Sequence, residues 1–325
     1  MWMQMNRTRK SVFAGNVGLP VLAVGAFAVL WAVLLHPRRG DILSSGVVAW
    51  WTVLCVLSVC NVYLWHLATV AAARRRATVE PAISLLQRQQ LLLSAVYVFG
   101  CGFRSILPRA DVQRIGLYDS WLSSVMVGRS VATVAELCFM AQWALLLNTV
   151  ARHAESRFGV LTSWLLLPLI VAAEMCSWTA VLTTSYLGNV AEESLWALSV
   201  SLLMVSSLKL WSCCRRPYRL FLAAALAVGI VYVTFMCTVD IPMYVSRWLA
   251  DEASGRAYLS VAEGFRDTWS RRSITFAWEA WRAEIPWMTL YFSVAVWCSI
   301  ALAHVPLIAP KPAFESPSGA SLPNA

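Results

Sequence analysis

The sequence has few charged residues, and this shortage argues against a soluble protein. Charged residues make up 13% of the 325 positions, whereas hydrophobic residues make up 59%. Soluble domains carry about 25% charged residues, so water is not the main solvent of this chain. We expect an all-α, polytopic membrane bundle of about eight transmembrane helices in a single domain, 1–308, followed by a disordered cytoplasmic tail, 309–325.

The sequence also lacks the common catalytic and metal-binding motifs. It contains no GxxxxGKS/T, HExxH, GxSxG or CxxC segment. This argues against a P-loop nucleotide site, a zinc protease of that type, an α/β-hydrolase and a paired-cysteine metal site. The nine cysteines lie mostly inside apolar runs and are interpreted as small buried hydrophobic residues. No cofactor is therefore predicted.

Lysine is scarce. Of the 26 basic residues only Lys10, Lys209 and Lys311 are lysine, a bias typical of a GC-rich genome, which favours a bacterial inner membrane. The net charge of +9 is not taken as a sign of nucleic acid, because basic residues in membrane proteins mark cytoplasmic loops and contacts with anionic lipids. We expect membrane lipids as partners.

The apolar stretches define the expected helices. A span needs about 20 mostly apolar residues to cross the hydrocarbon layer. The predicted spans are 16–36, 45–72, 90–107, 123–150, 159–185, 194–213, 220–241 and 286–307.

Basic residues in alternate loops predict the orientation. Short cytoplasmic loops are enriched in lysine and arginine. With the N-terminus in the cytoplasm, the short outer loops hold only Arg38, Arg39, Arg109 and Arg114, while the inner segments hold Arg7, Arg9, Lys10, Arg74, Arg75, Arg76, Arg88, Arg152, Arg157, Arg215, Arg216, Arg219 and Lys311. We therefore expect both termini in the cytoplasm and the long loop 242–285 outside.

That long outer loop contains an amphipathic pattern. Tyr258, Val261, Phe265 and Trp269 recur at helical spacing, and the other face carries Glu263, Arg266 and Asp267. Such a pattern predicts a helix that lies in the headgroup layer.

Ionisable residues inside the predicted spans are the first functional candidates. Each costs about 2.5–3.5 kcal/mol at a helix centre on insertion scales. The candidates are His66, Arg129, Glu136, Glu174 and Asp240. Arg104 and Lys209 are nearer to span ends, where we expect long side chains to extend to the interface.

One helix face in the fourth span combines two of these charges. Arg129, Thr133 and Glu136 follow one another at helical spacing. The two charges are about 10 Å apart along the axis, so we expect no direct salt bridge unless the long Arg129 side chain reaches inward, and we expect each charge to have another partner. Either Arg129 holds an anion while Glu136 transfers a proton, or the two fix helix packing as an internal ion pair.

The other candidates each have a functional and a structural interpretation. Asp240 precedes Pro242, which we expect to end or kink the seventh span; it is a candidate general acid or base, or a residue at headgroup level. Glu174 is a candidate proton relay or a buried hydrogen-bonded carboxyl. His66 is a weak metal or haem candidate, and a structural hydrogen bond is the favoured interpretation.

Several arginines collect on the predicted outer side. Arg104, Arg109, Arg129 and Arg247 are the candidate ligand-binding residues, because the planar guanidinium binds phosphate or carboxylate with two hydrogen bonds. The alternative is ordinary anchoring to lipid headgroups.

Three functions remain open on the sequence alone. The first is binding or processing of an anionic, possibly lipid-linked, ligand at the outer leaflet, with Glu136 and Asp240 as catalytic candidates. The second is a proton-coupled transporter that uses Glu136 and Glu174, and the third is a non-catalytic scaffold or assembly subunit. A single pocket of arginines and carboxylates favours the first, a polar path through the midplane the second, and paired charges without a cavity the third.

Overall fold

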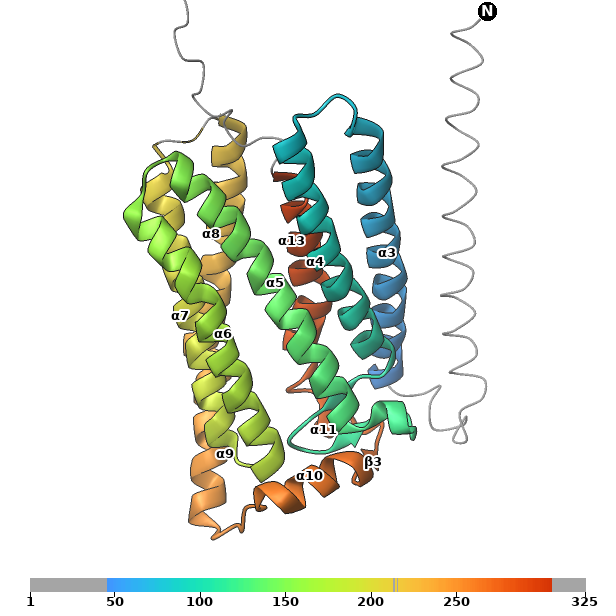
Figure 1. The fold of residues 1–325 in the computed structure, drawn as a ribbon. Coiled ribbons are helices and arrows are strands. Elements are labelled where there is room, and N and C mark those ends of the chain that lie inside the picture. The colour runs from blue at the N-terminus through green and yellow to red at the C-terminus, as the bar shows by residue number, and fades with distance from the viewer. Residues whose placement is uncertain (1–45, 213, 215, 306–325) are drawn as a thin grey trace, which may run out of the picture.

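The computed structural model describes residues 46–212, 214 and 216–305. Its long helices are α3 (Gly46–Arg75), α4 (Pro81–Ile106), α5 (Val125–His153), α6 (Arg157–Thr183), α7 (Tyr186–Leu210), α8 (Arg216–Phe235) and α9 (Ile241–Ala253). The predicted span 16–36 and the tail 309–325 lie outside the described residues. Figure 1 shows a helical bundle whose long helices run side by side.

Six of the described helical segments are long and apolar enough to cross a membrane. They are α3, α5, α6, α7, the continuous stretch Tyr218–Ala253 and the final stretch Ile285–Leu302. The final stretch is built from α12 (Ile285–Leu290), a π-helical turn (Tyr291–Ala295) and α13 (Val296–Leu302). The more polar α4 has 26 residues and packs against α3 and α5. The chain is therefore a multi-pass helical membrane protein.

Serine residues determine where several helices begin. Ser124, Ser156, Ser185 and Ser260 precede α5, α6, α7 and α10 (Val261–Ser270), and each accepts a hydrogen bond from a backbone N–H of the first turn. These N–H groups have no partner within the helix, so the serine side chain stabilises the helix start.

Three predicted helix boundaries are wrong. The span predicted to begin at residue 90 begins at Pro81. The span predicted to begin at residue 194 begins at Tyr186, because the polar residues Asn189 and Glu192 resemble a loop in the sequence but are buried in the first turns of α7. The span predicted to end near Pro242 continues to Ala253. A π-helical turn, Met236–Asp240, precedes Pro242 and shifts the hydrogen-bond register, so the missing N–H of proline does not end the helix.

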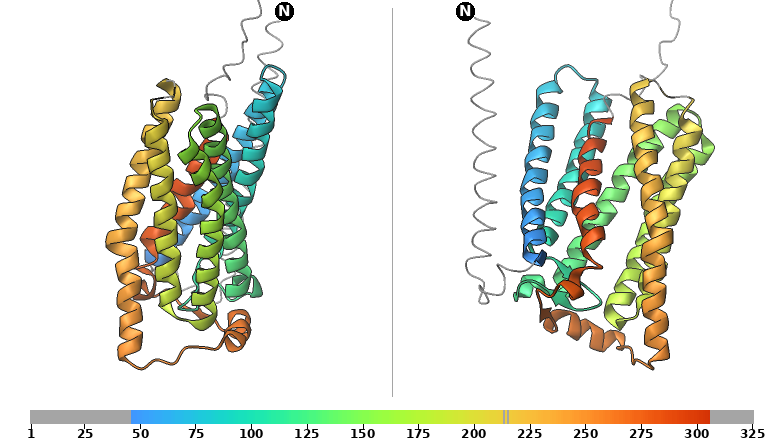
Figure 2. Two further views of the ribbon diagram at one scale, coloured as in Figure 1. Left: turned by 60° about the vertical axis from the view of Figure 1, so that its left-hand side comes forward. Right: turned by 180° about the vertical axis from the view of Figure 1, so that it is seen from behind.

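The predicted amphipathic helix forms as α10, although Tyr258 lies before its cap. It crosses one end of the bundle (Figure 1, Figure 2) and packs on α6, where a Cβ at Gly264 would lie 1.8 Å from the Leu182 carbonyl oxygen. Val261 and Phe265 point away and are exposed. Glycine at position 264 therefore allows α10 to approach the bundle closely.

A small sheet lies at the same end. Strand β1 (Arg109–Ala110) pairs antiparallel with β2 (Ile115–Gly116), and β2 pairs parallel with β3 (Ser273–Ile274). Two short helices complete this region, a single 3-10 turn (Trp121–Ser123) and α11 (Trp278–Trp281). The sheet joins the connection between α4 and α5 to the long loop after α9.

Buried amides join the helices at the centre of the bundle. The Gln142 side chain donates to the backbone oxygens of Gln90 (3.0 Å) and Ser299 (3.1 Å), and Ser299 Oγ donates to Gln142 Oε1 (2.6 Å). These contacts connect α4, α5 and α13. Inside a bundle they satisfy polar groups that no lipid could satisfy, and they hold the three helices in register.

Candidate functional site

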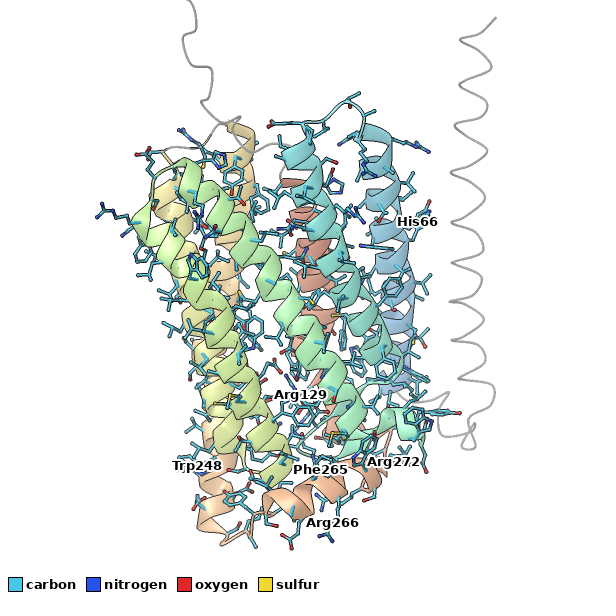
Figure 3. The ribbon with its side chains drawn as sticks, in the orientation of Figure 1. His66, Arg129, Trp248, Phe265, Arg266 and Arg272 are labelled. Atoms are coloured by element: carbon cyan, nitrogen blue, oxygen red, sulfur yellow. The ribbon has the colours of Figure 1, made fainter. Side chains whose placement is uncertain are left out.

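Arg129 is the centre of a buried charge cluster. Its Nη2 lies 3.2 Å from Glu136 Oε2, 2.8 Å from Glu174 Oε2 and 3.5 Å from Glu192 Oε1. The two charges on α5 therefore form a direct salt bridge, because the Arg129 side chain reaches along its own helix. The cluster joins α5, α6 and α7, and Figure 3 shows Arg129 inside the bundle.

Glu136 has two further partners. The Tyr291 hydroxyl donates to its Oε1 at 2.8 Å, and Arg104 Nη1 lies 3.7 Å from the same oxygen. The expectation that Arg104 extends to the interface is wrong, since this residue is 5% exposed and its guanidinium lies over the Tyr291 ring. Arg104 stands two residues before the end of α4, and its charge is directed inward to a carboxylate.

Glu174 and Glu192 complete the cluster. Thr133 donates to Glu174 Oε2 at 2.6 Å, and Trp178 Nε1 donates to Thr133 Oγ1 at 3.0 Å. Asn189 donates to Glu192 Oε2 at 3.2 Å. Sequence reasoning missed Glu192 because residues 186–193 were assigned to a loop; a helix begun at the Ser185 cap would have placed Asn189 and Glu192 on one face.

These three carboxylates are the one group in the described part of the chain with the spacing of a metal site. Single oxygens of Glu136, Glu174 and Glu192 lie within 4.8 Å of one another. The guanidinium of Arg129 already contacts all three carboxylates. It therefore supplies the positive charge that a metal ion would otherwise bring to this group. His66, the other metal candidate, lies on α3 far from Arg129 (Figure 3) and does not line the cavity described next.

A cavity of about 320 Å³ lies beside the cluster. Its charged walls contain Arg104, Arg109, Asp111, Arg129, Glu136, Glu192, Glu193, Asp240 and Glu284, and its apolar walls contain Phe139, Met140, Trp143, Trp196, Val200, Leu203, Met204, Leu226, Val294 and Ala295. The cavity is therefore amphipathic, with charge gathered in one part and hydrocarbon in the other.

The cavity is also open to the side of the bundle. Val228 and Val231 on α8 and Leu290 on α12 line it, and yet Val231 is 66% and Leu290 48% exposed. Figure 2 shows α8 and the final helix as neighbours on the rear face of the bundle. The opening thus lies between two helices that are apolar enough to cross a membrane.

Some polar groups around the cavity have unused hydrogen-bonding capacity. Buried atoms without a partner include Arg109 Nη2, Arg129 Nε, Ser177 Oγ and Asn189 Oδ1. The structure gives the carboxylates of Asp240 and Glu193 no hydrogen bond or salt bridge to a described residue, and Asp240 is only 5% exposed. Buried polar groups are usually satisfied, so these groups mark a place for a ligand or water.

Arg109 is fixed in the wall by local contacts. Its Nε lies 2.8 Å from Asp111 Oδ1 and its Nη1 donates to the Ser124 carbonyl at 2.6 Å. The guanidinium occupies the space that a Cβ at Gly128 would fill, with Nη2 only 0.8 Å from that position. Burial raises the pKa of Asp111, but Arg109, Arg104 and Arg129 outweigh it and hold that pKa below its ordinary value of 3.8.

Arg247 lies behind the cavity wall and does not line it. Its Nη1 is 3.4 Å from Glu284 Oε1, and its guanidinium lies over the rings of Tyr186 and Tyr244. Glu284, which does line the cavity, also accepts from Trp287 Nε1 at 2.7 Å.

The fold and site define a class: a multi-pass helical membrane protein with an internal amphipathic cavity and a buried arginine–carboxylate cluster. Comparison with known proteins adds no name to this class, because no family model, no curated protein and no solved structure matches the chain.

Proposed function

We propose that the protein binds, in its internal cavity, an amphipathic membrane molecule with an anionic polar group. The observation that carries this proposal is the division of one cavity into a charged part and an apolar part. Its volume of about 320 Å³ falls at the lower end of the usual range for ligand sites, about 300–1,000 Å³. This volume suits a headgroup with the first part of its chain.

The arginines supply the anion-binding groups of this proposal. Arg109 and Arg129 each have one guanidinium nitrogen without an acceptor, and both residues line the cavity with Arg104. A phosphate or carboxylate in the cavity would meet the positive charge of these guanidinium groups, and hydrogen bonds between charged groups are stronger than neutral ones. Arg247, held by Glu284, has a supporting role.

Entry from the bilayer follows from the position of the opening. The exposed lining residues Val231, on α8, and Leu290, on α12, flank the opening, and both belong to stretches apolar enough to cross a membrane. A lipid-linked molecule enters there with its chain still in the membrane, so its apolar part needs no transfer through water.

The topology belongs to the same proposal. We propose eight spans in a bacterial inner membrane, with the N-terminus in the cytoplasm and the charged part of the cavity toward the outer leaflet. Arg74, Arg75 and Arg152 lie at the bundle end opposite to α10 (Figure 1), which supports this orientation.

Asp240 is the best placed candidate for acid–base chemistry on a bound ligand. Its carboxylate lines the cavity and makes no hydrogen bond or salt bridge with a described residue, whereas Glu136 is held by Arg104, Arg129 and Tyr291. A general acid or base needs access to the reacting proton, so we propose Asp240 before Glu136 as the catalytic residue.

Proton-coupled transport is the second candidate. It is favoured by the sharing of Arg129 among three carboxylates, Glu136, Glu174 and Glu192, because like charges at such distances favour retention of a proton. In that function Glu174 would relay the proton.

Lipid analysis of cavity-blocked protein tests the binding function. Val200→Trp fills the apolar part of the cavity, and the matched control Val171→Trp places the same ring on an exposed position of α6. We expect native mass spectrometry to detect a retained amphiphile in the wild type and in the control but not in Val200→Trp. The melting temperature of Val200→Trp should be unchanged. Equal retention in all three proteins would overturn the proposal.

A further inference from the structure

The arginines of the cavity all lie on one of its walls. The wall built by the end of α4, by β1 and by α5 carries Arg104, Arg109 and Arg129. The wall built by α7, α8, the π-helical turn and α9 carries Glu192, Glu193 and Asp240, and its lining residues include no lysine or arginine. The first wall also carries Asp111 and Glu136, which are paired with these arginines, and Arg129 reaches Glu192 at 3.5 Å. Glu193 and Asp240, which have no such pair, lie on the wall opposite to the arginines.

Two of the carboxylates that line the cavity have no salt bridge to an arginine. Glu136 is paired with Arg104 and Arg129, Asp111 with Arg109, and Glu284 with Arg247. Glu193 and Asp240 are the carboxylates of the lining without a salt bridge in the described chain, and Arg247 attracts Asp240 only from beyond salt-bridge distance. A purely anionic headgroup would satisfy the arginines but would leave these two carboxylates facing like charge, which is unfavourable in a desolvated site.

Aromatic rings accompany the two unpaired carboxylates. Tyr232 and Tyr244 line the same wall, and Tyr232 lies within electrostatic range of both Glu193 and Asp240. Carboxylates together with aromatic faces are the usual surroundings of a bound ammonium group. The Asp240 carboxylate accepts hydrogen bonds, and a primary ammonium supplies three donors whereas a quaternary ammonium supplies none.

Resting on the proposed function, we propose that the ligand headgroup is zwitterionic, a phosphate joined to a primary ammonium as in phosphatidylethanolamine. The phosphate lies at Arg109 and Arg129, the ammonium at Asp240 and Glu193, and the acyl chain lies along the apolar part of the cavity toward the lateral opening.

Defined lipids with identical acyl chains test the headgroup. Delipidated protein is incubated with palmitoyl-oleoyl phosphatidylethanolamine, phosphatidylglycerol or phosphatidylcholine, and retention is measured by native mass spectrometry. We expect the wild type to retain phosphatidylethanolamine about tenfold better than either other lipid, in keeping with the strength of hydrogen bonds to charged groups.

Two isosteric variants locate the ammonium site. Asp240→Asn and Glu193→Gln should each remove most of the preference over phosphatidylglycerol, while the exposed Glu279→Gln leaves it unchanged. Two variants at separate positions keep the test valid if one of them does not fold, and the melting temperature reports folding.

The outcomes separate this inference from the proposed function. No retained lipid of any class would overturn both. Preferred binding of phosphatidylglycerol by the wild type, or a preference that survives both Asp240→Asn and Glu193→Gln, would overturn the zwitterionic headgroup and leave the anionic ligand standing. Equal binding of phosphatidylcholine would overturn the primary ammonium.

Discussion

Arg129 on α5 donates to Glu174 on α6 at 2.8 Å, and Thr133, one turn further along α5, donates to the same carboxylate oxygen at 2.6 Å. One residue of α6 is thus held by two successive turns of the neighbouring helix. The contact joins the helices at a fixed height and presents the remaining guanidinium surface to the cavity.

Arg129 should matter more for stability than any one of its carboxylate partners. Arg129→Gln leaves three buried carboxylates without their shared cation, and breaking a buried pair in this way costs about 3–5 kcal/mol. Glu136→Gln leaves Arg129 bound to Glu174, so we expect a smaller loss. Melting temperatures in detergent compare the two variants, with the exposed Arg282→Gln as a control that changes stability by less than about 1 kcal/mol. Equal losses in Arg129→Gln and Glu136→Gln would contradict this account.

Arg129→Lys separates charge from geometry. Lysine retains the positive charge but not the planar fork of arginine, so the fold should persist while ligand retention falls. Native mass spectrometry beside a melting curve measures both. Retention equal to that of the wild type would show that the charge alone is sufficient and that hydrogen bonds from the guanidinium do not hold the ligand.

Gly128→Ala should displace Arg109. The new methyl group would occupy the position of the Arg109 guanidinium, 0.8 Å from Nη2, and the salt bridge to Asp111 must shift or break. We expect a loss of about 1–3 kcal/mol, the usual effect of overpacking, together with weaker ligand retention. Gly46→Ala is the matched control, because a Cβ there meets Trp278 at an ordinary 3.7 Å. Similar melting temperatures for the two variants would show that Arg109 moves without cost.

The salt bridge of Asp111 should make stability depend on acid. A carboxyl with a lowered pKa in the folded protein stabilises the fold above its unfolded pKa of about 3.9, and this contribution is lost as pH falls through the folded value, which lies below 3.8. Asp111→Asn should therefore be less stable than the wild type at pH 7 and should approach it in strong acid. Melting temperatures of the two proteins across this pH range test the prediction. A difference in melting temperature that grows as the pH falls would contradict it.

Reporter fusions test the proposed orientation. Fusions near residues 80, 155 and 217 should report the cytoplasm, and a fusion near residue 260, just before α10, should report the outside, because the short loops at the first three sites are rich in arginine. A cytoplasmic signal near residue 260 would place the charged part of the cavity at the inner leaflet.

The sequence predicts the bundle better than it predicts the site. Long apolar runs indicate helices whatever their neighbours are, and the spacing of Arg129, Thr133 and Glu136 places them on one face without knowledge of other helices. The partners Glu192 and Tyr291 lie on distant parts of the chain, so only tertiary packing brings them to Arg129 and Glu136. Glu192 was also not predicted as a site residue because the polar residues in the first turns of α7 resemble a loop.

The lateral opening between α8 and α12 determines which measure of ligand concentration governs binding to this protein. A ligand that enters from the bilayer is counted as a mole fraction among lipids in two dimensions, not as molecules per litre of water. Occupancy then follows lipid composition, and even a weak intrinsic affinity is sufficient for an abundant lipid. If the proposed lateral entry holds, exchange would be set by diffusion in the membrane plane and by the packing of acyl chains around Val231 and Leu290.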